Sequence, residues 1–431
     1  NNLMCGISGF LKLHEGARVP FEWTRMVDAL AHRGPDDDGF YASPTVGLGM
    51  RRLAIIDVAG GAQPISNERD TIYVVYIGEI YNYRALRAEL ETRGHVFKTQ
   101  SDTETIVHGY EEWGERVSAK LRAMFAYALW DASVKRLVVA RDHFGIKPMF
   151  YTLVDDVLFF ASEIKALLLH PRLKREMDLC ALNQYLSFLY VPAPRTMFQN
   201  IFELPPAHQL IVEKGHVRVE RFWKPETQPR AMNDADARQL IRDAFEDSVR
   251  TQLVSDVQLG AFLSGGIDSS AIVAMMKRHM NASVKTFSLG FGAAEANWDE
   301  TQAAARVAKF FGTEHYAFQI EPNVVELAPH VVAHFDQPFA NPTAVLMLLL
   351  ARETRKHVTV ALSGTGGDEL FGGYPRYAGM LAFEKYQRVP EALRGLVAKG
   401  ARSFLRDASN GNLRMQRARR FFEGGALSFQ E

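Results

Sequence analysis

Two patterns of apolar and polar positions divide the chain. Up to residue 172, short apolar runs of strand length dominate, and apolar residues repeat with a helical period only in Tyr83–Thr92 and Thr103–Trp113. Strands are predicted at Gly6–Leu13, Val46–Asp57, Thr71–Tyr76, Met124–Ala132, Arg136–Arg141 and Val157–Ala161. Runs of strands interrupted by a few helices indicate stacked sheets with helices on the outside.

From residue 236 onward, helices and strands alternate. The predicted helices are Arg238–Leu253, Asp268–His279, Glu300–Phe311 and Thr343–Lys356. The predicted strands are Val257–Leu263, Val284–Leu289, His315–Ile320 and His357–Leu362. This alternation predicts an α/β domain with a doubly wound parallel sheet. Residues 173–235, with six prolines, are expected to connect it to a domain at residues 5–172 and to carry some structure of their own.

Length and composition narrow the class of protein. The chain has 431 residues, and 47% of them are hydrophobic. A chain of this length is too long for one ordinary hydrophobic core, so two domains are expected. Its net charge is zero, so no nucleic-acid partner is expected. The apolar runs are too short to span a membrane, and no secretory signal opens the chain. The sequence leaves open whether the protein forms a homodimer.

Cysteine usage indicates the compartment. The two cysteines, Cys5 and Cys180, exclude a disulfide scaffold and favour a reducing, cytoplasmic setting. Because Cys180 has apolar neighbours, we expect it to be a buried thiol.

A glycine-rich loop follows the predicted strand Val257–Leu263. It reads Ser-Gly-Gly-Ile-Asp-Ser-Ser over Ser264–Ser270, and a helix comes next. Glycines at 265 and 266 allow backbone amides to approach a ligand closely, and the start of a helix favours phosphate. Asp268 is placed to hold Mg²⁺ between phosphate oxygens.

A second loop with two Gly-Gly pairs, Ser363–Tyr374, follows the predicted strand His357–Leu362. Ligands of open parallel sheets bind at the carboxyl ends of the strands, where Asp368 would be a second Mg²⁺ ligand. Either loop alone could be a tight turn. Together, each with an acid after a strand, they predict a nucleotide site.

The two loops resemble the synthetase domain of asparagine synthetases, an ATP-pyrophosphatase of the adenine nucleotide α-hydrolase type. In that family such an enzyme adenylates a carboxylate with ATP, and ammonia then displaces AMP. The resemblance implies ATP and Mg²⁺ as cofactors. It implies ATP contacts at Phe262, Ser264, Gly265, Gly266, Asp268, Ser269, Leu289, Ser363 and Gly364, and Mg²⁺ ligands at Asp268 and Asp368.

Near the N-terminus, Cys5 begins the segment Cys-Gly-Ile-Ser-Gly-Phe. A thiol there is usually incidental when it stands alone. Six further segments change this reading: Arg33–Asp36, Arg52–Asp57, Gly78–Asn82, Ser101–Glu104, Arg141–Gly145 and Ser162–Lys165. Together they resemble the class II glutaminase domain, which has an αββα Ntn-hydrolase-type fold. Its cysteine uses its own α-amine as the general base.

The residue types suit glutamine hydrolysis. A thiolate at Cys5 would attack the side-chain amide, release ammonia and leave a thioester. Arg52 offers a fork of donors to the substrate's α-carboxylate. Glu79, Asp102 and the Gly78 carbonyl suit its α-ammonium. The resemblance adds Ile55 to the glutamine-binding residues and makes Gly78 catalytic through its backbone N–H.

The chain departs from the family pattern near both catalytic centres. Ile77 replaces an asparagine that donates to the oxyanion, and the loss of one such donor costs roughly 10²–10³ in rate. Either another donor substitutes, or the glutaminase is weak and free ammonia is the main nitrogen source. Thr365 replaces an acid assigned to the synthetase step.

Both ends of the chain also differ from the family pattern. Asn1–Met4 precede Cys5, whose nitrogen is an amide while they remain. Either they are an added leader with the initiator methionine, or the species is an unprocessed form without glutaminase activity. The resemblance also implies further chain beyond the Tyr374–Tyr377 segment, including a lysine for the acyl-phosphate transition state.

We therefore expect a glutamine- or ammonia-dependent amidotransferase that converts a carboxylic acid, with aspartate as the first choice, into its amide. An amidotransferase for another acid, such as a sugar acid, a cell-wall acid or a secondary metabolite, is the alternative that Thr365 motivates. A protein that senses ATP or glutamine is the alternative from another class.

Overall fold

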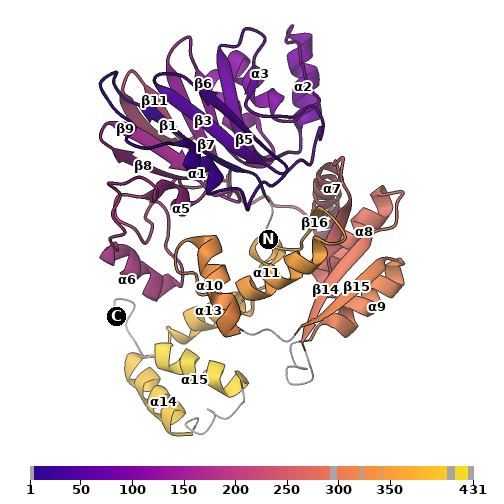
Figure 1. Cartoon of the computed structure of the whole chain (residues 1–431). Coiled ribbons are helices and arrows are strands. Elements are labelled where there is room, and N and C mark those ends of the chain that lie inside the picture. The colour runs from indigo at the N-terminus through magenta and orange to yellow at the C-terminus, as the bar shows by residue number, and fades with distance from the viewer. Residues whose placement is uncertain (1–3, 292–298, 321–323, 342, 405–412, 426–431) are drawn as a thin grey trace. The chain divides into compact units, whose positions relative to one another are not determined.

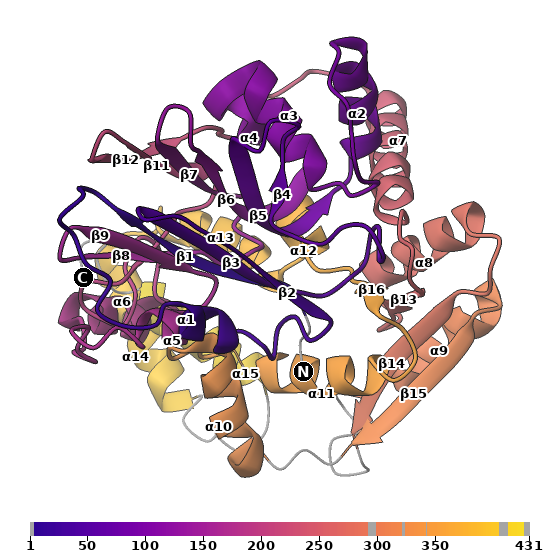
Figure 2. The ribbon, with the colours of Figure 1, turned by 45° about the horizontal axis from the view of Figure 1, so that its top comes forward.

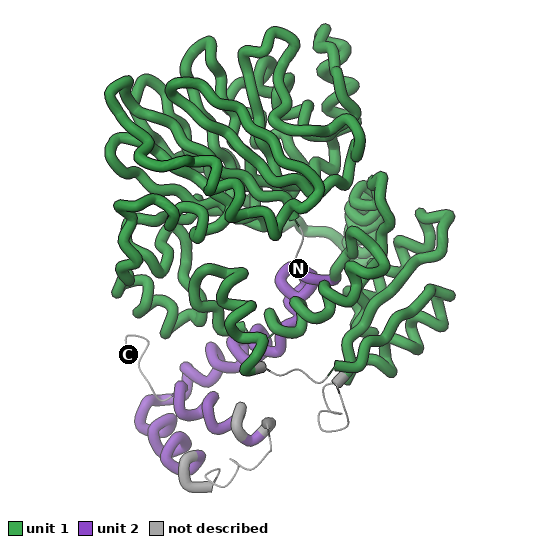
Figure 3. Tube along the Cα trace, viewed as in Figure 1, with its two compact units in different colours: residues 1–363 green, residues 364–431 purple. Residues whose placement is uncertain are grey.

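The computed structural model describes residues 4–291, 299–320, 324–341, 343–404 and 413–425. The chain divides into two compact units, residues 1–363 and residues 364–431, which Figure 3 colours separately. The first unit contains all three sheets formed by the described residues.

Two antiparallel sheets of six strands form the N-terminal part of the first unit. One has the order β10-β8-β9-β1-β3-β2, and the other has the order β12-β11-β7-β6-β5-β4. The strands of the first are β1 (Gly6–Lys12), β2 (Asp37–Ala42), β3 (Val46–Arg52), β8 (Phe150–Val154), β9 (Val157–Ala161) and β10 (Phe202–Glu203). Those of the second are β4 (Ile65–Ser66), β5 (Ile72–Ile80), β6 (Ala123–Asp131), β7 (Arg136–Arg141), β11 (His208–Glu213) and β12 (His216–Arg221).

The two sheets stack face to face, with helices outside each of them (Figure 2). Apolar side chains from both sheets, such as Leu48 and Val139, form the core between them. Helices α2 (Tyr83–Thr92), α3 (Glu104–Trp113) and α4 (Val117–Lys120) cover the outer face of one sheet. Helices α1 (Thr24–Asp28) and α5 (Ile164–Leu167) cover that of the other. The predicted αββα arrangement is confirmed.

Several predicted elements differ from the structure at their ends. The strand predicted over Val46–Asp57 ends at Arg52, because the side chain of Arg52 binds the carbonyls of the following residues and holds them as a loop. The strand predicted to end at Tyr76 continues to Ile80. Residues 173–235 contain α6 (Leu179–Phe188) and three strands. Strand β10 belongs to the first sheet, and β11 and β12 belong to the second. The domain boundaries at 172 and 235 stay predictions.

Cys180 is exposed, so the prediction of a buried thiol is wrong. Its backbone N–H donates to the N-cap residue Asp178, which places it in the first turn of α6. The only fully buried residue of that helix is Ala181, so apolar neighbours in the sequence do not cover the thiol.

A parallel sheet of four strands follows, in the order β15-β14-β13-β16. The strands are β13 (Leu259–Phe262), β14 (Lys285–Phe291), β15 (Glu314–Ile320) and β16 (Val360–Leu362), and the helices are α7 (Asp234–Gln252), α8 (Ile267–His279), α9 (Thr301–Phe311), α10 (Val324–Phe335) and α11 (Thr343–Thr354) (Figure 1). One core contains residues of α7, α8 and α9, and a second contains Leu350 of α11. The predicted doubly wound sheet is confirmed.

The strand order reverses beside β13, which has β14 on one side and β16 on the other. In parallel sheets, a reversal of this kind opens a crevice at the carboxyl ends of the two strands. The loops that follow β13 and β16 therefore begin at the edge of the sheet where such folds bind ligands.

The second unit is helical in its described residues. Its helices are α12 (Gly367–Phe371), α13 (Pro375–Tyr386), α14 (Glu391–Phe404) and α15 (Leu413–Gly425). The ring of Tyr386 packs against Phe421 and Phe422. In the part of the chain that the structure describes, each helix is too short or too polar to cross a membrane.

Candidate functional site

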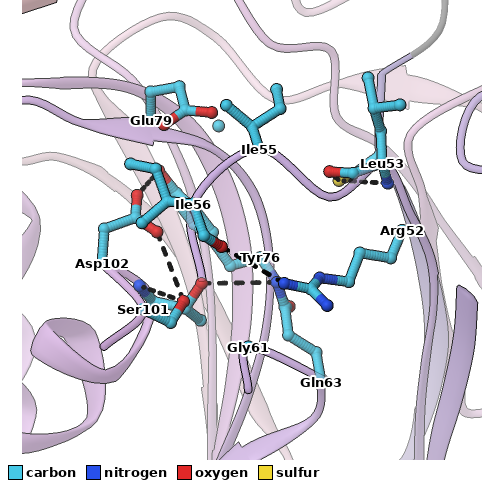
Figure 4. Close-up of a pocket in the computed structure, with 13 residues that line it drawn as sticks. Arg52, Leu53, Ile55, Ile56, Gly61, Gln63, Tyr76, Glu79, Ser101 and Asp102 are labelled. Atoms are coloured by element: carbon cyan, nitrogen blue, oxygen red, sulfur yellow. Dashed lines mark hydrogen bonds between the residues drawn. The ribbon is translucent and has the colours of Figure 1, made fainter. Parts of the chain in front are cut away.

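A pocket opens at one end of the αββα sandwich, with an empty volume of about 310 Å³. Its lining comes from four separate segments of the chain, which the fold brings together (Figure 4). The lining residues are Cys5, Arg52, Leu53, Ile55, Ile56, Gly61, Gln63, Tyr76, Gly78, Glu79, Ser101, Asp102 and Thr103. All six residues predicted to bind or hydrolyse glutamine are among them.

Cys5 directly precedes β1, whose first residue, Gly6, pairs with Arg51 of β3. This register places the thiol beside the loop that follows β3. The N–H of Leu53 donates to Cys5 Sγ at 3.1 Å, and the thiol lies 3.4 Å from the Leu53 carbonyl. Burial raises the pKa of the Cys5 thiol, and the Leu53 hydrogen bond and the Lys147 charge offset part of this effect. The sulfur is therefore held in place as a thiol.

An ion-pair network supports the main chain at Cys5. Arg33 Nε donates to the Cys5 carbonyl at 2.9 Å, and Arg33 Nη1 donates to Glu163 at 2.8 Å. Glu163 also contacts His32 and Lys165. Both partners of the Arg33–Glu163 pair are buried, so the pair fixes the position of the nucleophile's backbone.

Gly78 lies in β5, on the wall of the pocket. Its φ of 144° is unusual for other residues, and a Cβ there would lie 2.0 Å from the carbonyl oxygen of Met124. Only glycine fits this position. The backbone N–H at 78 is the donor that the sequence predicts for the oxyanion.

Two acidic residues, Glu79 and Asp102, line the pocket. Asp102 accepts hydrogen bonds from the Tyr76 hydroxyl at 3.2 Å and from the Ile80 N–H at 2.9 Å. Burial raises the pKa of Asp102, and burial together with the charge of Asp102 raises the pKa of Glu79 well above its usual range. Two buried carboxyl groups that resist ionisation together are stabilised by a bound cation. The pair suits a substrate ammonium group.

Arg52 lines the opposite part of the pocket, but its guanidinium also holds the local chain. Nη2 donates to the Asp57 carbonyl at 2.7 Å and to the Ile56 carbonyl at 3.3 Å, and Nη1 donates to the Val58 carbonyl at 3.1 Å. The side chain is therefore fixed before any substrate binds. This rigidity favours recognition of a carboxylate at a set position.

Ile77 is absent from the pocket lining. Its side chain is 1% exposed and belongs to the core between the two sheets, against which Cys5 also packs. The side chain at 77 therefore lies on the core side of β5, whereas Gly78 lines the pocket.

Sequence reasoning missed several lining residues. Tyr76 could have been found, because it lies two residues before Gly78 and so on the same face of a strand. Leu53 contributes its main-chain N–H, which no side-chain pattern reveals. Gln63 and Ser101 come from loops whose path depends on the whole fold.

The loop after β13 has the conformation expected of a phosphate-binding turn. Gly265 has a φ of 82°, and a Cβ there would lie 2.6 Å from the backbone carbonyl carbon of Ala303. The hydroxyls of Ser264 and Ser269 are 3.0 Å apart, and the Gly266 N–H donates to Ser264 Oγ at 3.2 Å. Helix α8 starts at Ile267, directly after the two glycines.

This loop fits a phosphate group and a magnesium ion on chemical grounds. Ser270 Oγ is buried and has no hydrogen-bond partner among the described residues. The first turn of α8 carries Asp268, a partly exposed carboxylate at the positive end of the helix dipole. Asp268 would hold a Mg²⁺ ion here, and the ion would offset the negative charge of the phosphates.

The other predicted nucleotide residues divide between the two units. Phe262 and Leu289 lie in the neighbouring strands β13 and β14 and share one apolar cluster. Ser363 directly follows β16, which pairs with β13. Gly364 and Asp368 belong to the second unit, where Asp368 lies in the first turn of α12.

Comparisons with known protein families match two consecutive parts of the chain. A family model described as a glutamine amidotransferase domain matches residues 4–223. A second family model, described as asparagine synthase, matches residues 240–427.

Relatives match both parts at once. Asparagine synthetase [glutamine-hydrolyzing] 1 of Bacillus subtilis is 40% identical over 399 residues, which cover 91% of this chain and 62% of that protein. A Methanocaldococcus jannaschii protein, provisionally named asparagine synthetase [glutamine-hydrolyzing] 2, is 32% identical over 427 residues, covering 92% of this chain and 80% of the relative. The chain thus spans between 62% and 64% of the length of the first three relatives. It belongs to the family of glutamine-hydrolysing asparagine synthetases.

Proposed function

We propose that the protein makes asparagine from aspartate, with glutamine as the nitrogen donor and ATP as the activating substrate. The products would be asparagine, glutamate, AMP and pyrophosphate. One observation carries the proposal: the six residues predicted from sequence for glutamine chemistry, Cys5, Arg52, Ile55, Gly78, Glu79 and Asp102, line a single pocket. The relatives named above support aspartate as the acceptor.

In the first half-reaction, Cys5 Sγ attacks the side-chain amide carbon of glutamine, forms a thioester and expels ammonia. The proton of the thiol passes to the α-amine of residue 5 once that residue is the first of the chain, and then to the leaving nitrogen. Water hydrolyses the thioester to glutamate. In this proposal Arg52 binds the α-carboxylate, Glu79 and Asp102 bind the α-ammonium, and the Gly78 N–H donates to the oxyanion; all four residues line the pocket.

In the second half-reaction, the acceptor carboxylate attacks the α-phosphate of ATP, and pyrophosphate leaves. Ammonia then attacks the acyl carbon of the adenylate and displaces AMP. The backbone of Ser264–Ser270 and the dipole of α8 would hold the phosphates, with Asp268 and Asp368 as the acids for Mg²⁺. When bound, Mg²⁺ neutralises charge that develops on the phosphate oxygens.

Thr365 is the observation in favour of a second acceptor. It replaces the acid of the family pattern in the loop that follows β16. Threonine cannot act as a base at neutral pH. A carboxylate other than aspartate is therefore the alternative, and a panel of acids distinguishes the two proposals.

The experiment measures both half-reactions in the full-length protein after removal of Met4 and the residues before it. Pyrophosphate release is followed with aspartate and with a panel of other carboxylic acids, using either glutamine or ammonium chloride as the nitrogen source. Asp268→Asn should abolish pyrophosphate formation and leave glutamate release intact. Cys5→Ala should abolish glutamate release and keep ammonia-dependent synthesis. If none of the acids supported pyrophosphate release, the result would contradict the enzyme proposal and favour a sensor.

A further inference from the structure

A cluster of histidine and glutamate side chains lies on the outer side of the glutaminase fold, apart from the pocket. It contains Glu68 from the loop between β4 and β5, His95 from the loop after α2, and His108 and Glu111 from α3. One donor atom from each of Glu68, His95 and His108 lies within 4.8 Å of the other two. None of these residues lines the Cys5 pocket.

Three donor atoms lie close to one another in this cluster, one each from Glu68, His95 and His108, and Glu111 lies next to both histidines. Nδ1 of His108 lies 3.2 Å from Oε2 of Glu111 and 3.8 Å from Oε1 of Glu68. Nδ1 of His95 lies 3.6 Å from the same Oε2 of Glu111. In a tetrahedral zinc site with nitrogen and oxygen ligands, neighbouring donor atoms are about 3.3 Å apart. The observed separations are close to that value.

The other ring nitrogen of each histidine has a carboxylate neighbour of its own. Nε2 of His108 lies 3.3 Å from Oε1 of Glu104, and Nε2 of His95 lies 3.7 Å from Oε2 of Glu112. Glu104 hydrogen-bonds to the His108 imidazole and orients that ring, as carboxylates do in many zinc sites, while Glu112 is a charged neighbour of His95. Nδ1 of each histidine lies near Glu111.

The carboxylate partners are themselves held in place. Glu104 accepts hydrogen bonds from the N–H groups of Lys98 and Thr99, each at 2.7 Å. The other oxygen of Glu111, Oε1, accepts from Asn67 at 2.9 Å and from Arg69 at 3.1 Å. Its Oε2 is thereby directed at the two histidines. The cluster is organised by its surroundings and needs little rearrangement to bind a ligand.

We propose that His95, His108, Glu68 and Glu111 form a binding site for a divalent transition metal ion, with zinc as the best match to its ligands. Two imidazole nitrogens and two carboxylate oxygens are a donor set that zinc accepts in four-coordinate sites. On binding, Nδ1 of His108 releases any proton it carries to solvent and gives its lone pair to the metal.

The position of the cluster predicts a structural role for the metal. It would connect α3 to the loop after α2 and to the β4–β5 connection. Asp102 and Thr103, which line the pocket, directly precede α3. A metal ion would therefore stabilise the wall of the pocket without contacting the substrate.

The test uses the full chain with both cysteines, Cys5 and Cys180, replaced by alanine, because an exposed thiol would also bind the probe metal. Excess Mg²⁺ fills the sites that prefer oxygen ligands. Co²⁺ is added while its visible absorption is recorded, and Zn²⁺ is then added in competition. One equivalent of Co²⁺ per chain should give a tetrahedral spectrum that Zn²⁺ removes, and Zn²⁺ should raise the thermal unfolding midpoint.

Matched variants locate the binding. His95→Gln should abolish the spectrum and the thermal shift, and Glu68→Gln, at an exposed position, should do the same if His95→Gln fails to fold. Glu112→Gln should weaken binding by about 10- to 100-fold, because it removes a carboxylate behind a ligand. The control His216→Gln, exposed on β12, should bind as the parent does. A spectrum that survives in His95→Gln, or no stoichiometric binding in the parent, would show instead that the cluster is an ion-pair network without a metal.

Discussion

Ile77 occupies the position at which the family motif has asparagine. Its side chain is buried in the core between the sheets, where Cys5 packs against the same cluster. The next residue, Gly78, has the donor N–H and the backbone conformation that the pocket needs. The oxyanion would therefore have one of its two expected donors, and the other is replaced by an apolar group.

We predict that Ile77→Asn raises the rate of glutamine hydrolysis by roughly 10²-fold, because it restores a donor to the oxyanion. Glutamine affinity should change less, since the donor acts in the transition state. A buried amide with incomplete hydrogen bonding should also lower the free energy of unfolding by about 1–3 kcal/mol. Glutamate release and urea unfolding, both measured on chains that begin at Cys5, check these outcomes.

Ile77→Val is the matched control, since it shortens the side chain without adding a donor. It should cost about 0.5–1.5 kcal/mol of stability and leave glutamine hydrolysis unchanged. Ammonia-dependent synthesis should be the same in all three proteins. Equal glutaminase rates for isoleucine and asparagine would mean that another group already completes the oxyanion site.

Among the elements, the turn between β13 and α8 is tightly constrained by its surroundings. The positive φ of Gly265 and the close approach of Ala303, in α9, leave no room for a side chain. The turn, the start of α8 and the start of α9 therefore form one packed unit. A change at residue 265 must displace backbone atoms of the loop or of α9.

We predict that Gly265→Ala lowers ATP-dependent pyrophosphate formation by about 10²-fold or more, because a shift of the loop by about 1 Å misplaces the phosphates. Glutamate release should be unaffected, since the Cys5 pocket contains no residue of this loop. Gly395→Ala is the control: nothing lies within 4 Å of the added Cβ in α14, so activity should stay normal. Normal pyrophosphate formation in Gly265→Ala would argue against this loop as the phosphate site.

At the scale of the whole molecule, the side chain of Glu163 forms ion pairs between segments that are far apart in the sequence. It precedes α5 and pairs with Arg33, which follows α1, and with His32 and Lys165. Burial alone would raise the pKa of Glu163. The hydrogen bonds from His32 and Lys165 and the Arg33 charge outweigh that effect and lower the pKa to about 2.

A lowered carboxyl pKa makes stability depend on pH in one direction. The contribution of Glu163 is fully present above the pKa of about 4.5 in the unfolded chain, and it is lost as the pH falls towards about 2. It amounts to at most about 3 kcal/mol. We predict that Glu163→Gln lowers the unfolding midpoint at pH 7 and that the difference from the parent shrinks below pH 4.5.

Glu89→Gln is the control for this prediction, because its pair with Arg93 is exposed and such pairs contribute little. Its unfolding midpoint should match that of the parent at each pH. A difference between Glu163→Gln and the parent that persists unchanged at pH 3 would contradict a role for the ionised carboxylate.

Local patterns in the sequence were enough to predict much of this architecture. The helix Tyr83–Thr92 has the predicted bounds, because its amphipathic repeat depends only on neighbours three and four residues apart. The strand–helix alternation after residue 236 likewise predicted the parallel sheet. The short motifs predicted which residues would meet at the Cys5 pocket, because each motif combines a backbone requirement with a chemical group.

Other features depend on contacts between distant segments, and the tertiary structure alone decided them. Arg52 ends β3 early because carbonyl groups fold back onto its side chain, and Cys180 is exposed because α6 buries a different face. His95 and His108 meet Glu68 only when the β4–β5 loop packs beside α3. The sequence alone determined which local elements form and which chemical groups they carry, since these depend on neighbours along the chain. Burial, hydrogen-bond partners and charge clusters depend on packing between elements, and no local pattern encodes that packing.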